Sequence, residues 1–171
     1  CQTSRWKVTL VTSTVVSIEP ATAASAQVLA ALHGQIFDDG QQVWNTAAFA
    51  ELLAMPGAKA WIATLDSQNA PNSQTEIQPV GLALVRFAAD EGEIITIGIL
   101  PEYRRSGIAR RLLKEIIDLA AMSRASITLE VAADNEAALL LYGRNEFLRI
   151  GRRKGYYRRI DGEKMDAIVL Q

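Results

Sequence analysis

A short turn rich in arginine and small residues has the composition of a phosphate-binding loop. Residues 104–109 read RRSGIA and separate an isoleucine-rich stretch, residues 94–99, from an amphipathic pattern that begins at Ile108. Gly107 can adopt a positive φ, and the first N–H groups of a helix have no partner within that helix. A diphosphate would satisfy these donors and the helix dipole. The alternative is an ordinary strand-to-helix corner with solvated arginines.

Glu130 and Tyr142 are further polar residues that need an explanation. In residues 126–131 the pleat places Ile127, Leu129 and Val131 on one face and Glu130 on the other. A carboxylate on an inner strand is costly unless it meets water, an opposite charge or a functional site. Tyr142 falls within a helical apolar pattern, where it also suits a packing residue with its hydroxyl at the edge. Both interpretations stay open for each residue.

Together these segments resemble the GNAT superfamily of N-acetyltransferases. Arg104, Gly107 and Ala109 fill the three fixed places of its acetyl-CoA loop, Arg/Gln-x-x-Gly-x-Gly/Ala. Residues 129–142 match the pattern LEVxxxNxxAxxLY, which is similar to the corresponding segment of the bacterial ribosomal-protein alanine N-acetyltransferases, a branch of that superfamily.

The resemblance implies a role for each matching residue. Glu130 would be the general base and Tyr142 the general acid, while Tyr156 and Tyr157 would help to form the peptide side of the cleft. The N–H groups of residues 105–110 would hold the CoA diphosphate, and residues 97–99 would pair with the pantetheine arm like an added strand. The implied acetyl-CoA-binding residues are Ile97, Gly98, Ile99, Arg104, Arg105, Ser106, Gly107, Ile108, Ala109, Arg110 and Asn135.

The resemblance extends to the C-terminal end, with one departure. Glu146 stands before Phe147 where the family usually has glycine, and we expect Asn145 to take the left-handed conformation instead. A basic cluster follows, Arg149, Arg152, Arg153, Lys154, Arg158 and Arg159. It is either a solvated face, a contact for the CoA 3′-phosphate, or a contact for RNA near a ribosomal substrate.

The implied function is the transfer of an acetyl group from acetyl-CoA to a protein N-terminal α-amine, in particular to alanine of a small-subunit ribosomal protein. The amine would attack directly in a ternary complex. One alternative is an acetyltransferase for a small-molecule amine or an internal lysine. The other is a non-catalytic acetyl-CoA-binding module.

Composition bounds these readings. The chain has 171 residues, 49% of them apolar, and a formal net charge of −1. We expect a single N-acetyltransferase domain over residues 1–171, with an arm of unknown role at residues 1–13. Nucleic acid is not expected as a direct ligand, nor is a membrane. Because Cys1 is the only cysteine and His33 the only histidine, we expect no disulfide and no metal site, and a cytoplasmic protein.

The order of the elements predicts an α/β (α+β) fold, a GNAT-like mixed central sheet of about seven strands with helices on both faces. Strands are expected at residues 14–18, 59–66, 80–88, 94–99, 126–131, 147–154 and 165–170. In residues 94–99 the pleat would place Ile95, Ile97 and Ile99 on one face. Helices are expected at residues 21–36, with Pro20 at the start, from Asn45 or Thr46 to Pro56, from Ile108, and from Asp134 or Asn135 to about Asn145. An exposed loop is expected at residues 67–78.

Overall fold

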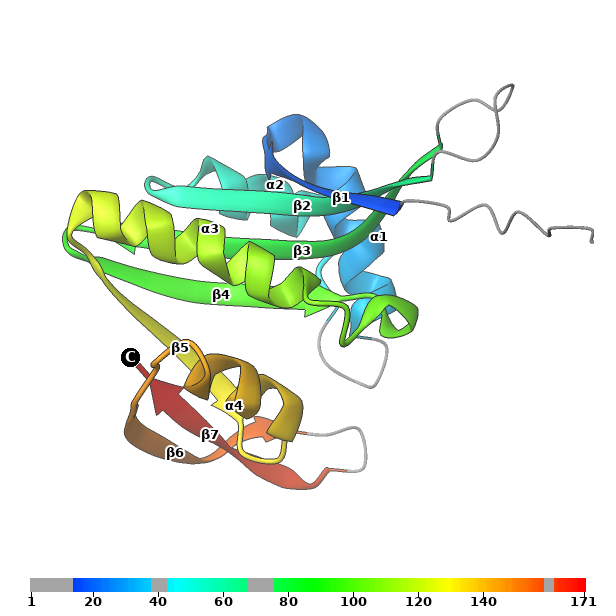
Figure 1. The fold of residues 1–171 in the computed structure, drawn as a ribbon. Coiled ribbons are helices and arrows are strands. Elements are labelled where there is room, and N and C mark those ends of the chain that lie inside the picture. Colours follow the sequence, from blue (N-terminus) through cyan, green and yellow to red (C-terminus); the bar gives the residue numbers. More distant parts are fainter. Residues whose placement is uncertain (1–13, 38–42, 68–75, 159–161) are drawn as a thin grey trace, which may run out of the picture.

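The computed structural model describes residues 14–37, 43–67, 76–158 and 162–171, so the predicted N-terminal arm lies outside the described residues. The prediction of a mixed sheet of about seven strands is confirmed, and the seven strands have the order β1-β2-β3-β4-β5-β7-β6 (Figure 1). Neighbouring strands are antiparallel except β4 and β5, which are parallel. The strands are β1 (Thr14–Ala21), β2 (Ala58–Ser67), β3 (Glu76–Ala88), β4 (Glu91–Ile99), β5 (Ser126–Ala132), β6 (Arg149–Arg158) and β7 (Lys164–Leu170).

Helices cover both faces of the sheet. They are α1 (Ala26–Ile36), α2 (Thr46–Ala54), α3 (Ile108–Ser123) and α4 (Glu136–Gly143), with short 3-10 turns η1 (Ala23–Ser25) and η2 (Pro101–Tyr103). Helix α3 crosses one face of β3 and β4, while on the other face α1 packs behind β3 and β4 and α2 packs behind β2 (Figure 1). Helix α3 connects the parallel pair β4 and β5, which need a crossover of this length.

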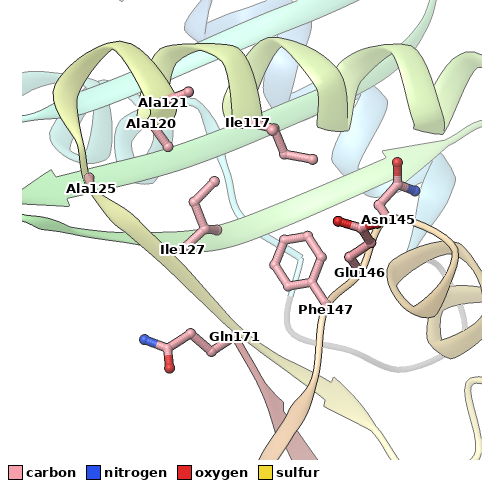
Figure 2. A pocket seen from close by; sticks show the side chains of 9 residues that line it. All are labelled: Ile117, Ala120, Ala121, Ala125, Ile127, Asn145, Glu146, Phe147 and Gln171. Atoms are coloured by element: carbon pink, nitrogen blue, oxygen red, sulfur yellow. The ribbon is translucent and has the colours of Figure 1, made fainter.

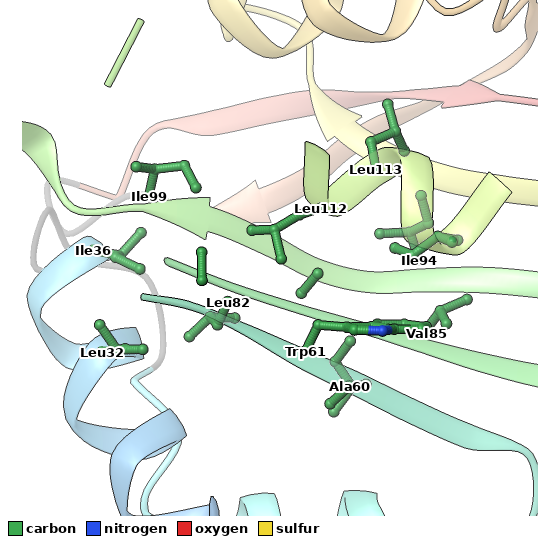
Figure 3. Close-up of a cluster of buried hydrophobic side chains, with 14 of the residues drawn as sticks. Leu32, Ile36, Ala60, Trp61, Leu82, Val85, Ile94, Ile99, Leu112 and Leu113 are labelled. Carbon is green, nitrogen blue, oxygen red and sulfur yellow. The ribbon is translucent and has the colours of Figure 1, made fainter. Parts of the chain in front are cut away.

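The core forms where α3 and α1 meet the sheet (Figure 3). Leu112, Leu113 and Ile116 of α3 are completely buried, because they recur at helical spacing on the face that meets the strands. Burying each such side chain contributes about 1.5 to 3 kcal/mol. From α1, Leu32 and Ile36 close the opposite face.

Strand β4 contains a bulge at Ile95. Its ladder with β3 shifts register here and passes from Ile94 directly to Thr96, so Ile95 has no partner on β3. The strict alternation predicted for residues 94–99 is therefore wrong.

The bulge marks the point where β4 separates from β5. The parallel ladder ends at the pair Ile94 and Leu129, and the remainder of β4 has β3 as a partner but not β5. Figure 1 shows the two strands diverging from here. Because a bulge bends its strand and increases the local twist, the extra residue accounts for the opening of the sheet.

Several predicted boundaries are wrong. The strand predicted at residues 147–154 is β6, Arg149–Arg158, so residues 155–158 are strand and residues 147 and 148 are not. Pro20 lies inside β1, opposite Trp61, and does not start a helix; α1 begins at Ala26. A proline without an N–H group is tolerated there because β1 is an edge strand. Glu76 begins β3, so residues 76–78 are strand and not loop. Residues 68–75 of the predicted loop lie outside the described residues.

Candidate functional site

The open edge of β4 is the first component of the site. Residues 97–99 pair with β3 on one side, while on the other side the ladder to β5 has already ended. Apart from Ile99 O, which accepts a hydrogen bond from Arg104 Nε, the outward backbone groups of this edge are therefore available to an extended ligand. A Cβ at Gly98 would lie 2.6 Å from Ile36 Cγ2, so glycine is what allows α1 to approach β4 so closely.

The turn after β4 directs a row of N–H groups outward. Arg105 and Gly107 have φ values of 60° and 84°, and Gly107 is the N-cap of α3 without a side-chain cap. The first backbone hydrogen bond of the helix runs from Arg111 N–H to Gly107 O. Within the described part of the chain, the N–H groups of residues 105–110 have no protein acceptor. Added to the helix dipole, they form an anion-binding concavity.

The side chain of Arg104, although exposed, stabilises this turn through two hydrogen bonds to main-chain carbonyls. Its Nε donates to Ile99 O at 3.2 Å and its Nη2 to Ile36 O at 3.3 Å, which connects the ends of β4 and α1. Ser106 Oγ donates to Tyr103 O. The guanidinium of Arg104 is thus bound to main-chain carbonyls, and the loop offers mainly N–H groups to a ligand.

Asn135 caps helix α4. Its Oδ1 accepts a hydrogen bond from Ala138 N–H at 3.1 Å, which satisfies one of the free donors of the first helical turn. The prediction that the helix starts at Asp134 or Asn135 is confirmed. The exposed Asn135 side chain retains its amide NH₂ group for another acceptor.

Glu130 lies in a polar network that reaches across the sheet. Its side chain is 21% exposed, and Oε1 accepts a hydrogen bond from Arg153 Nη1 at 2.5 Å. Tyr157 donates its hydroxyl proton to the backbone oxygen of Glu130 at 3.3 Å. The hydrogen bond between the Tyr156 side chain and Glu130 raises the pKa of Tyr156. The two tyrosine rings meet edge to face with centroids 5.1 Å apart.

Tyr142 belongs to the core at the junction of α4 and the sheet. It is 4% exposed and contacts the ring of Phe147, with the centroids 5.6 Å apart. Burial raises the pKa of Tyr142 well above that of an ordinary phenol, and nearby Tyr157 adds to this. Burial also raises the pKa of Tyr157, to about 12, with a contribution from the charge of Glu130. Both phenols therefore keep their protons near neutral pH.

A pocket of about 280 Å³ has Phe147 in its lining (Figure 2). It is mostly apolar, between the second half of α3, the start of β5 and the segment after α4. Glu130 and Tyr142 are not among its lining residues, which are Ile117, Ala120, Ala121, Ala125, Ile127, Asn145, Glu146, Phe147 and Gln171.

Comparison with known proteins establishes the family. The family described as Acetyltransferase (GNAT) family matches residues 29–147. The chain belongs to the GNAT acetyltransferase family. It is an acetyl-CoA-dependent N-acetyltransferase, as the resemblance implied.

Individual GNAT relatives carry more specific names. The chain is 39% identical over 144 residues to the N-alpha-acetyltransferase RimI of Mycobacterium tuberculosis. This alignment covers 84% of this chain and 85% of that protein. It is 37% identical over 89 residues to the ribosomal protein bS18-alanine N-acetyltransferase of Escherichia coli, over 52% of this chain and 60% of that protein. The crystal structure of the ribosomal-protein-S18-alanine N-acetyltransferase from Escherichia coli has the same fold, with a TM-score of 0.75 over 91% of this chain and 92% of that chain at 23% identity.

The GNAT fold brings the four residues with predicted catalytic or peptide-binding roles close to one another, and it adds one residue that the sequence did not single out. Glu130, Tyr156 and Tyr157 meet at one place, and Tyr157 lies close enough to Tyr142 to help raise the pKa of Tyr142. Arg153 is the addition. In the sequence it was one residue of a basic cluster, and its pairing with Glu130 follows from the strand order β5-β7-β6, which periodicity cannot supply.

The structure of this GNAT chain also tests the predictions for the residue after α4 and for the basic cluster. Asn145 does not adopt the left-handed conformation; Glu146 does, with φ 66°. Asn145 Nδ2 instead donates to Leu141 O at 2.7 Å. In the basic cluster, Arg152 and Arg153 form ion pairs with Asp166 and Glu130, whereas Arg159 lies outside the described residues. In the part of the chain that the structure describes, no helix has the length and apolar character needed to cross a membrane.

Proposed function

We propose that this enzyme acetylates the N-terminal α-amine of a protein, and that the acceptor is the terminal alanine of a small-subunit ribosomal protein. The names of its relatives support this acceptor class. The observation that carries the proposal is the opening between β4 and β5: unpartnered N–H groups lie on one side of it, and Glu130, with its tyrosine neighbours, lies on the strand of the other side.

The described residues fit acetyl-CoA. A Cβ added at Gly107 would meet no atom within 4 Å, so the start of α3 is open to a bulky anion. The N–H groups of residues 105–110 would hold the diphosphate, and Arg105 and Arg110 are exposed beside it for charge-assisted contacts. The open edge of residues 97–99 and the Asn135 amide would hold the pantetheine arm, which directs the thioester toward β5.

Glu130 and Tyr142 have the properties that amide formation requires. The acceptor attacks only as a neutral amine, so one group removes a proton and another returns a proton to the departing thiolate. Glu130, an acceptor once ionised, takes the proton directly or through a water. Tyr142 is suited to the second task, because burial keeps its phenol protonated.

An α-amine is the easier acceptor for this pair. Its ordinary pKa lies near 8, against about 10.4 for lysine, so deprotonating lysine costs roughly 3 kcal/mol more. Tyr156 and Tyr157 are on the same side of the sheet as the proposed base and present aromatic surface to the residues that follow the acceptor.

Three peptides test the acceptor. The first begins with a free alanine followed by a ribosomal-protein sequence, the second is the same peptide with a blocked N-terminus, and the third is blocked and contains an internal lysine. We expect thiol release and a single acetyl group, placed by mass spectrometry on the terminal amine, with the first peptide alone. Acetylation of the blocked lysine peptide at a comparable rate would contradict the proposal.

A further inference from the structure

The last hairpin is shaped so that three residues of β6 reach Glu130. The ladder between β6 and β7 shifts register between Arg153 and Tyr157, which leaves more residues on β6 than on β7. Gly155 has φ 57° within this bulge, and its N–H donates to Asp166 Oδ1 at 2.7 Å. This bond from Gly155, together with the ion pair from Arg152, lowers the pKa of Asp166. Asp166 on β7 therefore fixes the shape of the bulge.

Arg153 extends across an entire strand to reach its partner. Glu130 is on β5 and Arg153 on β6, with β7 between them, and the residue of β7 opposite Arg153 is the small, fully buried Ala167. The guanidinium carbon lies 4.3 Å from the centre of the Tyr156 ring, so the arginine is held by an aromatic face as well as by the carboxylate. Its side chain is 55% exposed.

Stability does not explain this arrangement well, because exposed ion pairs contribute little to folding. A planar guanidinium fixes the orientation of a carboxylate more strictly than an ammonium does. Here Arg153 Nη1 donates to Oε1 of Glu130, which leaves Oε2 for another partner. Tyr156 also lies beside this carboxylate, which raises the pKa of the Tyr156 hydroxyl.

We propose that Arg153 is a positioning residue for the acetyl transfer: bound to Oε1 of Glu130 and packed on Tyr156, it holds the carboxylate so that Oε2 receives the proton of the acceptor amine. This inference rests on the proposed function, since it assumes that Glu130 is the base. The guanidinium itself contacts neither acetyl-CoA nor the reacting atoms in this scheme.

The test compares R153Q and R153K with R149Q. Arg149 lies on the same strand, is exposed and pairs with Leu170 in the ladder, so R149Q makes the same charge change away from Glu130. We expect R153Q to lower kcat on the order of 30-fold, as misplacement of a catalytic group does, with the KM for acetyl-CoA within about twofold of wild type. R153K should recover part of the loss, and R149Q should match the wild type.

The pH profile separates positioning from a merely structural role. Loss of the guanidinium removes a positive charge beside the carboxylate, so the acidic limb of kcat/KM should move to higher pH in R153Q. R153K keeps the charge and should move the limb less. Thermal unfolding of each variant shows whether it is folded. If R153Q is not folded, kcat and the acidic limb of kcat/KM measured on R153K test the positioning role.

The double variant E130Q/R153Q makes the two proposals distinguishable. If Arg153 acts through Glu130, the double variant should be no slower than E130Q alone. Additive losses in the double variant would overturn the positioning role of Arg153 and leave Glu130 as the base. The same conclusion would follow if E130Q were inactive while R153Q kept the wild-type kcat and pH profile. An E130Q enzyme with wild-type turnover would overturn the base and Arg153 together.

Discussion

Helices α3 and α4 border the opening of the sheet, and they begin in opposite ways. Helix α4 starts with Asn135, whose side chain caps the Ala138 N–H, and α2 starts in the same way with Asn45 and Ala48. Helix α3 starts with Gly107, which has no side chain to offer. Two helices therefore satisfy part of their own N-terminal donors, whereas the longest one leaves its donors free.

The difference indicates a division of labour. A helix without a side-chain cap at its N-terminus is less stable by about 1 kcal/mol than the same helix with a cap. Leu112 and Leu113 are completely buried in the following turn, so tertiary packing holds α3 in place without the cap. We infer that α3 serves binding and α4 serves chemistry, since α4 carries Tyr142. The predictions below separate these two roles.

The largest effect is expected in α4, from Tyr142→Phe. Removing the proposed acid should lower kcat about 100- to 1000-fold with little change in the KM for acetyl-CoA. Because burial raises the pKa of Tyr142, the wild-type phenol stays protonated and the loss should be similar at neutral and mildly alkaline pH. Tyr103→Phe is the control, since that hydroxyl bonds only to Gln78 Oε1 in the described structure. Equal losses in kcat and acetyl-CoA affinity would contradict the assignment.

A smaller effect of the opposite kind is expected in α3, from Gly107→Asp. The new carboxylate would lie among the free N–H groups and compete with the diphosphate, so the KM for acetyl-CoA should rise on the order of 30-fold while kcat changes little. Stability should hardly change, because the strain of a positive φ and the gain of a cap are both about 1 kcal/mol.

Gly162→Asp is a matched control for this change. Gly162 has the same φ of 84° and no atom within 4 Å of an added Cβ, but it lies in the β6–β7 connection. Steady-state kinetics and calorimetric titration with CoA compare the two variants. A Gly107→Asp enzyme that binds CoA normally would show that the start of α3 is not the diphosphate site.

The caps themselves give a third comparison. Asn135→Ala and Asn45→Ala each remove one cap and should each lower the free energy of unfolding by about 1 kcal/mol. Only Asn135 borders the proposed pantetheine path, so only its variant should also raise the KM for acetyl-CoA, by a few fold. Thermal melts and kinetics on both variants measure this. Identical kinetics would limit Asn135 to its role as a cap.

Much of this architecture could be predicted from local sequence patterns. The start of α3 at Ile108, the cap of α2 at Asn45 and the strand that carries Glu130 all follow from periodicity and helix signals close in the chain. The bulge at Ile95 could not be predicted, because a run of isoleucines has no feature that marks one residue as extra. The prediction for Pro20 was wrong because a proline can lie within β1 only when β1 is at the edge of the sheet, and the sequence does not show the strand order.

The candidate site divides along the same line. Its loop is contiguous in sequence, so residues 104–109 were recognisable from composition and a family pattern. The network around Glu130 joins β5 to β6 across β7, so the role of Arg153 depends on long-range strand order. Likewise, Glu146 and not Asn145 adopts the left-handed conformation, while the Asn145 side chain donates a hydrogen bond to Leu141 O.

The smallest effect concerns the C-terminal exits of α3 and α4, where Arg124 is the C-cap of α3 and Glu146 lies two residues after Arg144, the C-cap of α4. Arg124 and Glu146 are non-glycine residues with positive φ, at 54° and 66°. Replacing either with glycine should relieve about 1 kcal/mol of strain and lose part of it to the more flexible unfolded chain, for a net gain of up to about 0.5 kcal/mol. Chemical denaturation of Arg124→Gly and Glu146→Gly measures the gain, and neither variant should change the kinetics. If Glu146→Gly alone altered kcat, the exit of α4 would also take part in placing Tyr142, and the contrast between the two helices would extend beyond their starts.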